Sequence, residues 1–139
     1  MVEDNPDDVV VIKRAFRRSG LRHTLENVRD GEEALDRLYG VGEHENAPLP
    51  DIILLDINIP KINGLEVLAK IKGNPNLRRI PVIVLTISER EEDMAKAYDS
   101  GAASYMTKPV DTKGFEELIT TLEDYWRVAR LPAGESPQR

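Results

Sequence analysis

The chain has 139 residues, of which 40% are hydrophobic and 32% are charged, values that are typical of one folded domain and exclude a largely disordered chain. It has no cysteine and a net charge of −6, which excludes disulfides and thiolate metal sites and makes nucleic acid an unfavourable partner. No apolar run is long enough to span a bilayer and the first residues are unlike a signal peptide, so we expect a cytoplasmic protein with no membrane partner.

Residues 51–56 hold a continuous apolar run between two acids, and residues 81–86 hold a second apolar run; both are typical of strands buried on both faces of a sheet. Shorter strands are predicted over residues 24–29 and 103–106. Segments of helical periodicity separate these strands, and Pro and Gly mark several of their ends. The predicted helices run from Pro6 to about residue 20, from Asp30 to Tyr39, over residues 64–72, from a capped start at Ser88 to about residue 101, and from Asp111 to about residue 130.

Parallel strands joined by helices require right-handed crossover connections. The sequence therefore predicts an α/β fold in which a doubly wound parallel sheet carries helices on both faces. We expect one domain over residues 1–130 and a mobile tail over residues 131–139, which contain two prolines and a glycine. Ligands of such sheets bind beyond the carboxyl ends of the strands, so the chemistry is expected there.

The residues at these strand ends are Glu3, Asp4, Asp56, Thr86 and Lys108. Converging carboxylates repel one another: at about 4 Å and an effective dielectric constant near 20, each pair costs roughly 4 kcal/mol before the solvent relaxes. Oxygen ligands without His or Cys suit Mg²⁺, which carboxylates commonly share with a phosphate group. A carboxylate can also attack phosphorus to form an aspartyl phosphate. The set therefore indicates a phosphoryl-transfer site.

Four short motifs occur in the order and spacing of response-regulator receiver domains of two-component signalling, which the chain resembles from residue 1 to about residue 129. They are Val2-Glu3-Asp4-Asn5, Leu54-Leu55-Asp56, Leu85-Thr86 and Lys108-Pro109. The resemblance implies a five-stranded, flavodoxin-like sheet. The longer runs at residues 3–8 and 56–60 resemble the single-domain regulators that partner bacterial phytochromes and related sensor histidine kinases.

The resemblance also implies the phosphoacceptor and the metal ligands. Asp56 would accept the phosphoryl group, and its place after a rigid buried strand is what a positioned nucleophile needs. Mg²⁺ would be bound by Asp4 and Asp56, by Glu3 directly or through water, and by the main-chain carbonyl of Asn58. Taken alone, Glu3 and Asp4 could instead merely start the helix at residue 6.

Further roles implied by the resemblance concern the phosphoryl group and the response to it. Lys108 and Thr86 would bind the phosphoryl oxygens, and Pro109 would follow a cis peptide bond that aims the lysine. Tyr105 would be the switch aromatic that turns inward when Thr86 moves. A half-buried strand tyrosine is the equally plain alternative for Tyr105, and Thr86 alone could be a strand-end threonine.

Two helix faces are candidate binding surfaces for partner proteins. The first helix has a basic face with Arg14, Arg17 and Arg18, which is either a solvated face or, as the resemblance implies, the docking face for the kinase. The last helix has an apolar stripe that includes Leu122, Tyr125 and Trp126. Part of this stripe must cover the sheet, and the rest is a candidate interface for a homodimer.

We interpret the chain as a stand-alone receiver that takes a phosphoryl group from a sensor histidine kinase onto Asp56 with Mg²⁺ and signals by binding, without turning over an external substrate. One alternative is an unphosphorylated pseudo-receiver scaffold. Another is a small phosphatase of the haloacid-dehalogenase type, which would require an Asp where this chain has Asn58.

The start of the chain departs from the family pattern. Receivers place about five apolar residues before the acidic pair, whereas only Met1 and Val2 precede it here. Without that central strand, two strand edges would face each other unpaired, and each orphan backbone group costs roughly 1 to 3 kcal/mol. We therefore expect either that the protein begins upstream of this numbering or that another chain lends a strand; direct pairing of residues 24–29 with 51–56 would contradict this.

Overall fold

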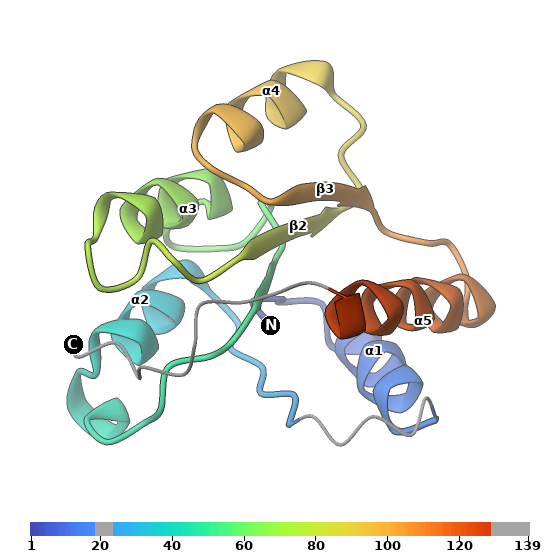
Figure 1. Ribbon diagram of the computed structural model, residues 1–139, viewed down its shortest axis with the longest axis horizontal. Coiled ribbons are helices and arrows are strands. Elements are labelled where there is room, and N and C mark those ends of the chain that lie inside the picture. Colours follow the sequence, from blue (N-terminus) through green and yellow to red (C-terminus); the bar gives the residue numbers. More distant parts are fainter. Residues whose placement is uncertain (19–23, 129–139) are drawn as a thin grey trace.

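The computed structural model describes residues 1–18 and 24–128, without the side chains of residues 126–128, and helices and strands alternate along it (Figure 1). The predicted end of the last helix near residue 130 and the predicted mobile tail lie outside the described residues. The elements are α1 (Pro6–Arg18), α2 (Gly31–Tyr39), the short 3-10 helix η1 (Gly42–His44), β1 (Ile53–Leu55), α3 (Gly64–Gly73), β2 (Val82–Thr86), α4 (Glu91–Asp99), β3 (Ser104–Thr107) and α5 (Thr112–Val128).

The sheet is parallel throughout. Strands β1, β2 and β3 lie in that order, and Leu55 of β1 pairs with Val84, which pairs with Tyr105 of β3. Beyond β1, Val2 forms parallel bridges to both Leu55 and Val28. Five chain segments thus lie side by side, which confirms the doubly wound α/β fold, although two of the five expected strands are reduced to single bridges.

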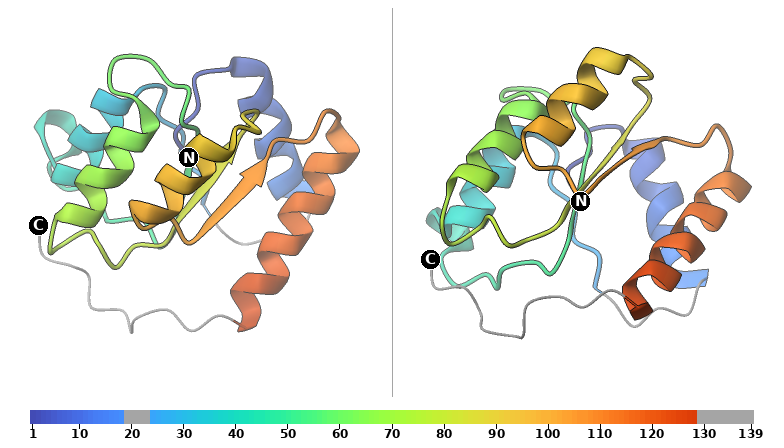
Figure 2. Two further views of the ribbon diagram at one scale, coloured as in Figure 1. Left: turned by 90° about the horizontal axis from the view of Figure 1, so that it is seen from above. Right: turned by 45° about the horizontal axis from the view of Figure 1, so that its top comes forward.

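Helices cover both faces of the sheet: α1 and α5 lie together on one face, and α2, α3 and α4 lie on the other (Figures 1 and 2). Alternation along β1 supplies both cores, because Leu54 packs beneath α1 and α5 whereas Ile53 and Leu55 pack beneath α2 and α3. All three residues of β1 are buried. Each buried aliphatic side chain contributes about 1.5–3 kcal/mol, so β1 is a firm base for the residue that follows it.

The start of α4 differs from the prediction. The helix begins at Glu91, three residues after the expected cap at Ser88. The Ser88 hydroxyl donates to Asp93 Oδ2 at 2.6 Å, and its oxygen accepts a hydrogen bond from the Arg90 N–H at 3.4 Å. Residues 87–90 therefore form a separate loop between β2 and α4.

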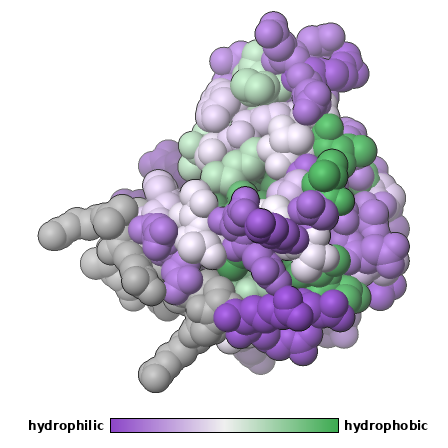
Figure 3. All heavy atoms as spheres, turned by 90° about the vertical axis from the view of Figure 1, so that its right-hand side faces the viewer, coloured by the Kyte–Doolittle hydropathy of each residue, from purple (hydrophilic) through white to green (hydrophobic). Residues whose placement is uncertain are grey.

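Most of the described part of the apolar stripe of α5 packs in the core. Leu122 is buried in the core beneath α1 and α5, which corrects its assignment to a dimer interface: the helix needs this residue to cover the sheet. The side of the molecule that bears α5 is largely hydrophilic, with separate hydrophobic patches (Figure 3). Tyr125 is half exposed, and the side chain of Trp126 lies outside the described atoms.

The first residues of the chain lie between residues 24–29 and residues 51–56, the two segments whose facing edges were expected to be unpaired. The Val2 N–H donates to the Leu54 carbonyl at 2.8 Å, and the Glu3 N–H donates to the Val28 carbonyl at 3.0 Å. In the described part of the chain, residues 24–29 therefore do not pair directly with 51–56. The pairing that would contradict the expectation about the first strand is not seen.

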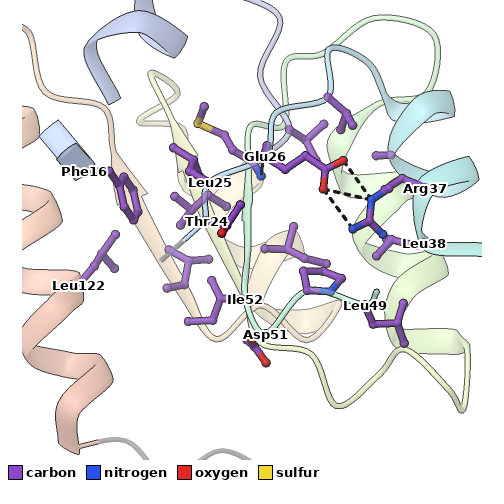
Figure 4. A pocket seen from close by; sticks show the side chains of 18 of the residues that line it. Phe16, Thr24, Leu25, Glu26, Arg37, Leu38, Leu49, Asp51, Ile52 and Leu122 are labelled. Carbon is purple, nitrogen blue, oxygen red and sulfur yellow. Dashed lines mark hydrogen bonds and ion pairs between the residues drawn. The ribbon is translucent and has the colours of Figure 1, made fainter. Parts of the chain in front are cut away.

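A cavity of about 470 Å³ extends from Val2 along the same line. Leu25 and Ile52 face it from the two sides, Phe16 and Leu122 close one end, and an ion pair between Arg37 and Glu26 borders the other (Figure 4). The cavity lies at the amino end of β1, whereas Asp56 follows the carboxyl end. It is therefore separate from the site predicted at the strand ends.

Candidate functional site

Asp56 is buried and fixed in orientation. Its Oδ2 accepts a hydrogen bond from Lys108 Nζ at 2.7 Å, and its Oδ1 accepts one from the Asn58 N–H at 3.0 Å. The side chain is 5% exposed. Asp56 thus directly follows a buried strand, and hydrogen bonds hold both of its carboxylate oxygens, which is the arrangement that a positioned nucleophile needs.

The loop after Asp56 is held close by Gly64, the first residue of α3. A Cβ at this position would lie 2.3 Å from the Asp56 carbonyl oxygen, so any side chain would collide with the backbone of the site. The Gly64 N–H also donates to the Ile57 carbonyl at 3.0 Å. The absence of a side chain at Gly64 thus lets α3 support the residues that follow β1.

Lys108 reaches the same point from the end of β3. Besides Asp56, its ammonium contacts Glu3 Oε2 at 2.6 Å and Asp8 Oδ2 at 3.0 Å. An ammonium has three N–H donors, so these carboxylates occupy all of them. Burial lowers the pKa of Lys108, but the hydrogen bonds from its ammonium to Asp56 and Glu3 outweigh this effect and raise the pKa above its ordinary value.

The carboxylates form a compact cluster. One oxygen from each of Glu3, Asp4 and Asp56 lies within 4.8 Å of the others; Glu3 and Asp56 are buried and Asp4 is exposed. Burial raises the pKa of Glu3, against the opposing hydrogen bonds from Lys108 and from the Asn5 N–H. An exposed oxygen beside two buried ones is an open set of hard ligands, which suits a divalent cation that keeps some of its water.

Thr86 and Tyr105 meet at one residue of the loop between β2 and α4. Thr86 is fully buried, and its Oγ1 accepts a hydrogen bond from the Ser88 N–H at 3.3 Å. The half-buried Tyr105 donates from its hydroxyl to the Ser88 carbonyl at 2.9 Å. A displacement of this loop would therefore act on both side chains.

The sequence matches the response regulator receiver domain over residues 1–122, most of the chain. The chain belongs to this family. Receiver domains of this kind are signalling proteins rather than enzymes, which rules out the haloacid-dehalogenase alternative. None of the helices within the described residues is long and apolar enough to cross a membrane.

Similar proteins agree with this assignment. The response regulator Rcp1 of Synechocystis sp. is 41% identical over 134 residues, which cover 96% of this chain and 91% of Rcp1. The crystal structure of the phosphorylated cyanobacterial phytochrome response regulator RcpA superimposes with a TM-score of 0.90 at 43% identity and 95% coverage of both chains. The Mn²⁺-bound form of Rcp1 gives a TM-score of 0.88 at 41% identity, with 95% of this chain and 96% of that chain covered.

One expectation for this receiver domain is wrong. None of the peptide bonds between described residues is cis, so Pro109 follows a trans bond. The trans form is the more stable one for an X–Pro bond by about 0.5–1 kcal/mol. With this bond trans, Lys108 still reaches Glu3, Asp8 and Asp56.

The basic face of α1 is only partly available. Arg14 and Arg17 are exposed, whereas the Arg18 guanidinium lies 2.6 Å from the Glu116 carboxylate on α5. Arg18 therefore ties two helices together, and this contact competes with its predicted role in docking. The docking role of Arg14 and Arg17 stays a prediction.

Asp8 has no predicted role in the site, because in the sequence it is only part of the start of a helix. Asp8 lies on the first turn of α1, whereas Asp4 precedes that helix, so helical spacing does not relate the two residues. The closeness of Asp8 to Glu3 and Asp4 in the sequence is the one signal that points to it. Its contact with Lys108, 100 residues away along the chain, could not be read from spacing.

Proposed function

We propose that this receiver domain accepts a phosphoryl group on Asp56 from a sensor histidine kinase, with Mg²⁺ as cofactor. The observation that carries the proposal is the placement of Asp56: a buried carboxylate, held by Lys108 and the Asn58 N–H, beside Glu3 and Asp4. An Asp56 oxygen forms the new bond to phosphorus while the bond from phosphorus to the histidine nitrogen breaks.

The other residues of the site have separate tasks in this proposal. Glu3, Asp4 and Asp56, with the main-chain carbonyl of Asn58, would hold Mg²⁺, which when bound neutralises the carboxylates and the phosphoryl oxygens. Lys108 supplies a point charge for one phosphoryl oxygen. These roles use oxygen ligands and one ammonium, a combination typical of phosphoryl transfer.

The signal would pass through the loop between β2 and α4. The Thr86 hydroxyl would bond a phosphoryl oxygen and give up its contact with the Ser88 N–H. Because Tyr105 bonds the carbonyl of the same residue, the loop movement would release or turn the tyrosine. The changed surface around the loop would then be what a downstream protein recognises.

The likeness to the cyanobacterial phytochrome response regulator RcpA supports a phytochrome-type histidine kinase as the partner. We propose that the exchange takes place in the cytoplasm, and that residues 1–130 are the unit that carries it out.

A first prediction concerns docking. Replacing Arg14 and Arg17 by Glu should slow transfer from the kinase at least tenfold and leave uptake from acetyl phosphate within about twofold, because charge on this helix serves recognition and not chemistry. Labelled phosphoryl transfer measures both rates. The matched control is the same double change at the exposed residues Arg78 and Arg79, on the turn before β2. Equal slowing with both donors would sink the docking hypothesis.

A second prediction concerns the metal. At a tenfold excess of Mg²⁺ over its dissociation constant, linkage adds about 1.4 kcal/mol of stability, and Tm should rise by roughly 3–8 °C. Asp4→Asn should reduce this rise. The metal-free Asp56→Asn variant should melt at a higher temperature than the wild type, because removing one carboxylate lowers the repulsion among the carboxylates that share the Lys108 ammonium. Calorimetry with and without chelator tests these shifts, and a Tm unmoved by millimolar Mg²⁺ would contradict the shared site.

A third prediction is a homodimer through α5. Tyr125 is half exposed near the end of this helix, and Trp126 follows it in the sequence. Tyr125→Ala with Trp126→Ala should weaken the dimer at least fivefold, while Thr121→Ala, an exposed change on the same helix, should not. Sedimentation equilibrium measures the association, and a wild-type monomer at tens of micromolar in both phosphorylation states would refute the idea.

A further inference from the structure

Asp8 stands apart from the other partners of the Lys108 ammonium. Glu3 and Asp56, the two closer ones, are members of the carboxylate cluster. Asp8 lies on the first turn of α1, contacts Nζ at 3.0 Å and is not a member of that cluster. Among the described residues, it is thus the one ammonium partner that neither the proposed metal nor the proposed phosphorylation uses.

Loading of the site would change the partners of Lys108. A divalent ion would draw Glu3 and Asp56 toward itself, and a phosphoryl group would form an acyl phosphate with an oxygen of Asp56. The short contacts of 2.6 Å and 2.7 Å that these residues make with the ammonium would then be weakened or lost. The contact with Asp8 requires neither change.

We propose that Asp8 is a positioning residue, which receives the Lys108 ammonium when a divalent ion occupies the carboxylate cluster and keeps it beside Asp56. The inference rests on the proposed function, in which loading with Mg²⁺ precedes transfer. The Lys108 side chain is 5% exposed and that of Asp8 is 24% exposed. A pair so shielded from water is screened less than a surface ion pair, so its loss should be measurable.

The consequence concerns metal affinity. Mg²⁺ must compete with the ammonium for Glu3 and Asp56, and Asp8 offers the displaced ammonium a carboxylate that the metal does not need. Without this carboxylate, the ammonium either keeps its hold on the cluster or is left buried and unpaired. Both outcomes make Mg²⁺ binding weaker.

Isothermal titration of Mg²⁺ into the full, unphosphorylated chain tests the proposal. Asp8→Asn should weaken Mg²⁺ binding about tenfold, the size of an ordinary coupling between residues in contact, and Asp8→Glu should restore much of the affinity. Asp7→Asn is the matched control, because it removes the same charge from an exposed position on the same turn. It should change the affinity by no more than about twofold.

A second background shows whether Asp8 acts through Lys108. In a Lys108→Met chain, Asp8→Asn and Asp7→Asn should have equal effects, since no ammonium remains to be received. The proposal is overturned if the two Asn variants behave alike in the wild-type background, or if the full effect of Asp8→Asn persists without Lys108. Circular dichroism of each variant confirms that it is folded before titration.

Phosphoryl uptake by the wild-type chain is measured separately with acetyl phosphate. If the wild type takes up no phosphoryl group while Asp8→Asn still weakens Mg²⁺ binding selectively, the proposed function fails and the positioning role of Asp8 stands. If uptake occurs and the two Asn variants bind Mg²⁺ equally, the proposed function stands and the role of Asp8 is wrong.

Discussion

Incubation with acetyl phosphate and Mg²⁺ should add one phosphoryl group to the wild-type chain and none to Asp56→Asn. The amide cannot serve as the nucleophile, whereas the buried backbone around it can remain as it is. The expected change in the initial rate of uptake is a loss of at least 100-fold, as for removal of a reacting group. Intact-mass spectrometry under conditions that preserve acyl phosphates measures the product directly.

Asp51→Asn is the matched control for this experiment. Asp51 precedes β1 and is exposed, whereas Asp56 follows the same strand and is buried, so both variants lose one carboxylate at an end of one element. Asp51→Asn should take up the phosphoryl group at the wild-type rate. Uptake that persists in Asp56→Asn would overturn the assignment, and a wild type that takes up none would favour an unphosphorylated scaffold.

The positions of Asp56, Thr86 and Lys108 could be predicted because each ends a run with a recognisable pattern. Residues 51–56 contain a continuous apolar run between two acids, and residues 81–86 contain another that ends at Thr86; such runs are typical of strands buried on both faces. Parallel strands place their carboxyl ends at one edge of the sheet. The sequence therefore places these three residues together. Strand β2 ends at Thr86 as predicted, whereas β1 ends at Leu55, one residue before the predicted end, and β3 ends at Thr107, one residue after it.

Other features depend on distances that no local pattern contains. Whether Arg18 meets solvent or Glu116 depends on how closely α1 and α5 approach, and periodicity gives the faces of each helix but not their separation. Leu122 belongs to a stripe wider than the sheet needs, so its place in the core follows only from the packing of both helices. The partners of Lys108 depend in the same way on the position of α1.

Local chemistry can also point to the wrong residue. Ser88 followed by acidic residues is typical of a helix cap, yet its hydroxyl bonds the Asp93 carboxylate, and its N–H and carbonyl bond Thr86 and Tyr105. Both of those side chains come from neighbouring strands. Tertiary contacts thus fix the N–H and the carbonyl of Ser88, while its hydroxyl donates to Asp93 and accepts from the Arg90 N–H. The regular helix α4 begins only at Glu91.

Lys108→Met should destabilise the metal-free protein by about 3 to 5 kcal/mol, because it leaves buried carboxylates without their cation. The Glu3 and Asp56 side chains are 3% and 5% exposed, so water cannot replace the ammonium, while Met keeps the packing of most of the lysine stem. Lys61→Met is the control, since Lys61 is 58% exposed and contacts Asp30 and Glu32 only at 3.6 Å and 3.9 Å. Its effect should stay within about 0.5 kcal/mol.

Mg²⁺ distinguishes lost charge from lost packing in this variant. A divalent ion brings two positive charges to the carboxylates that Lys108→Met leaves uncompensated, so saturating Mg²⁺ should recover more stability in the variant than in the wild type. Urea unfolding with and without Mg²⁺ gives both free energies. An equal gain in the two proteins would mean that the ammonium and the metal do not compete for Glu3 and Asp56. The contacts of 2.6 Å and 2.7 Å that Lys108 makes with these carboxylates would then not lie in the metal site.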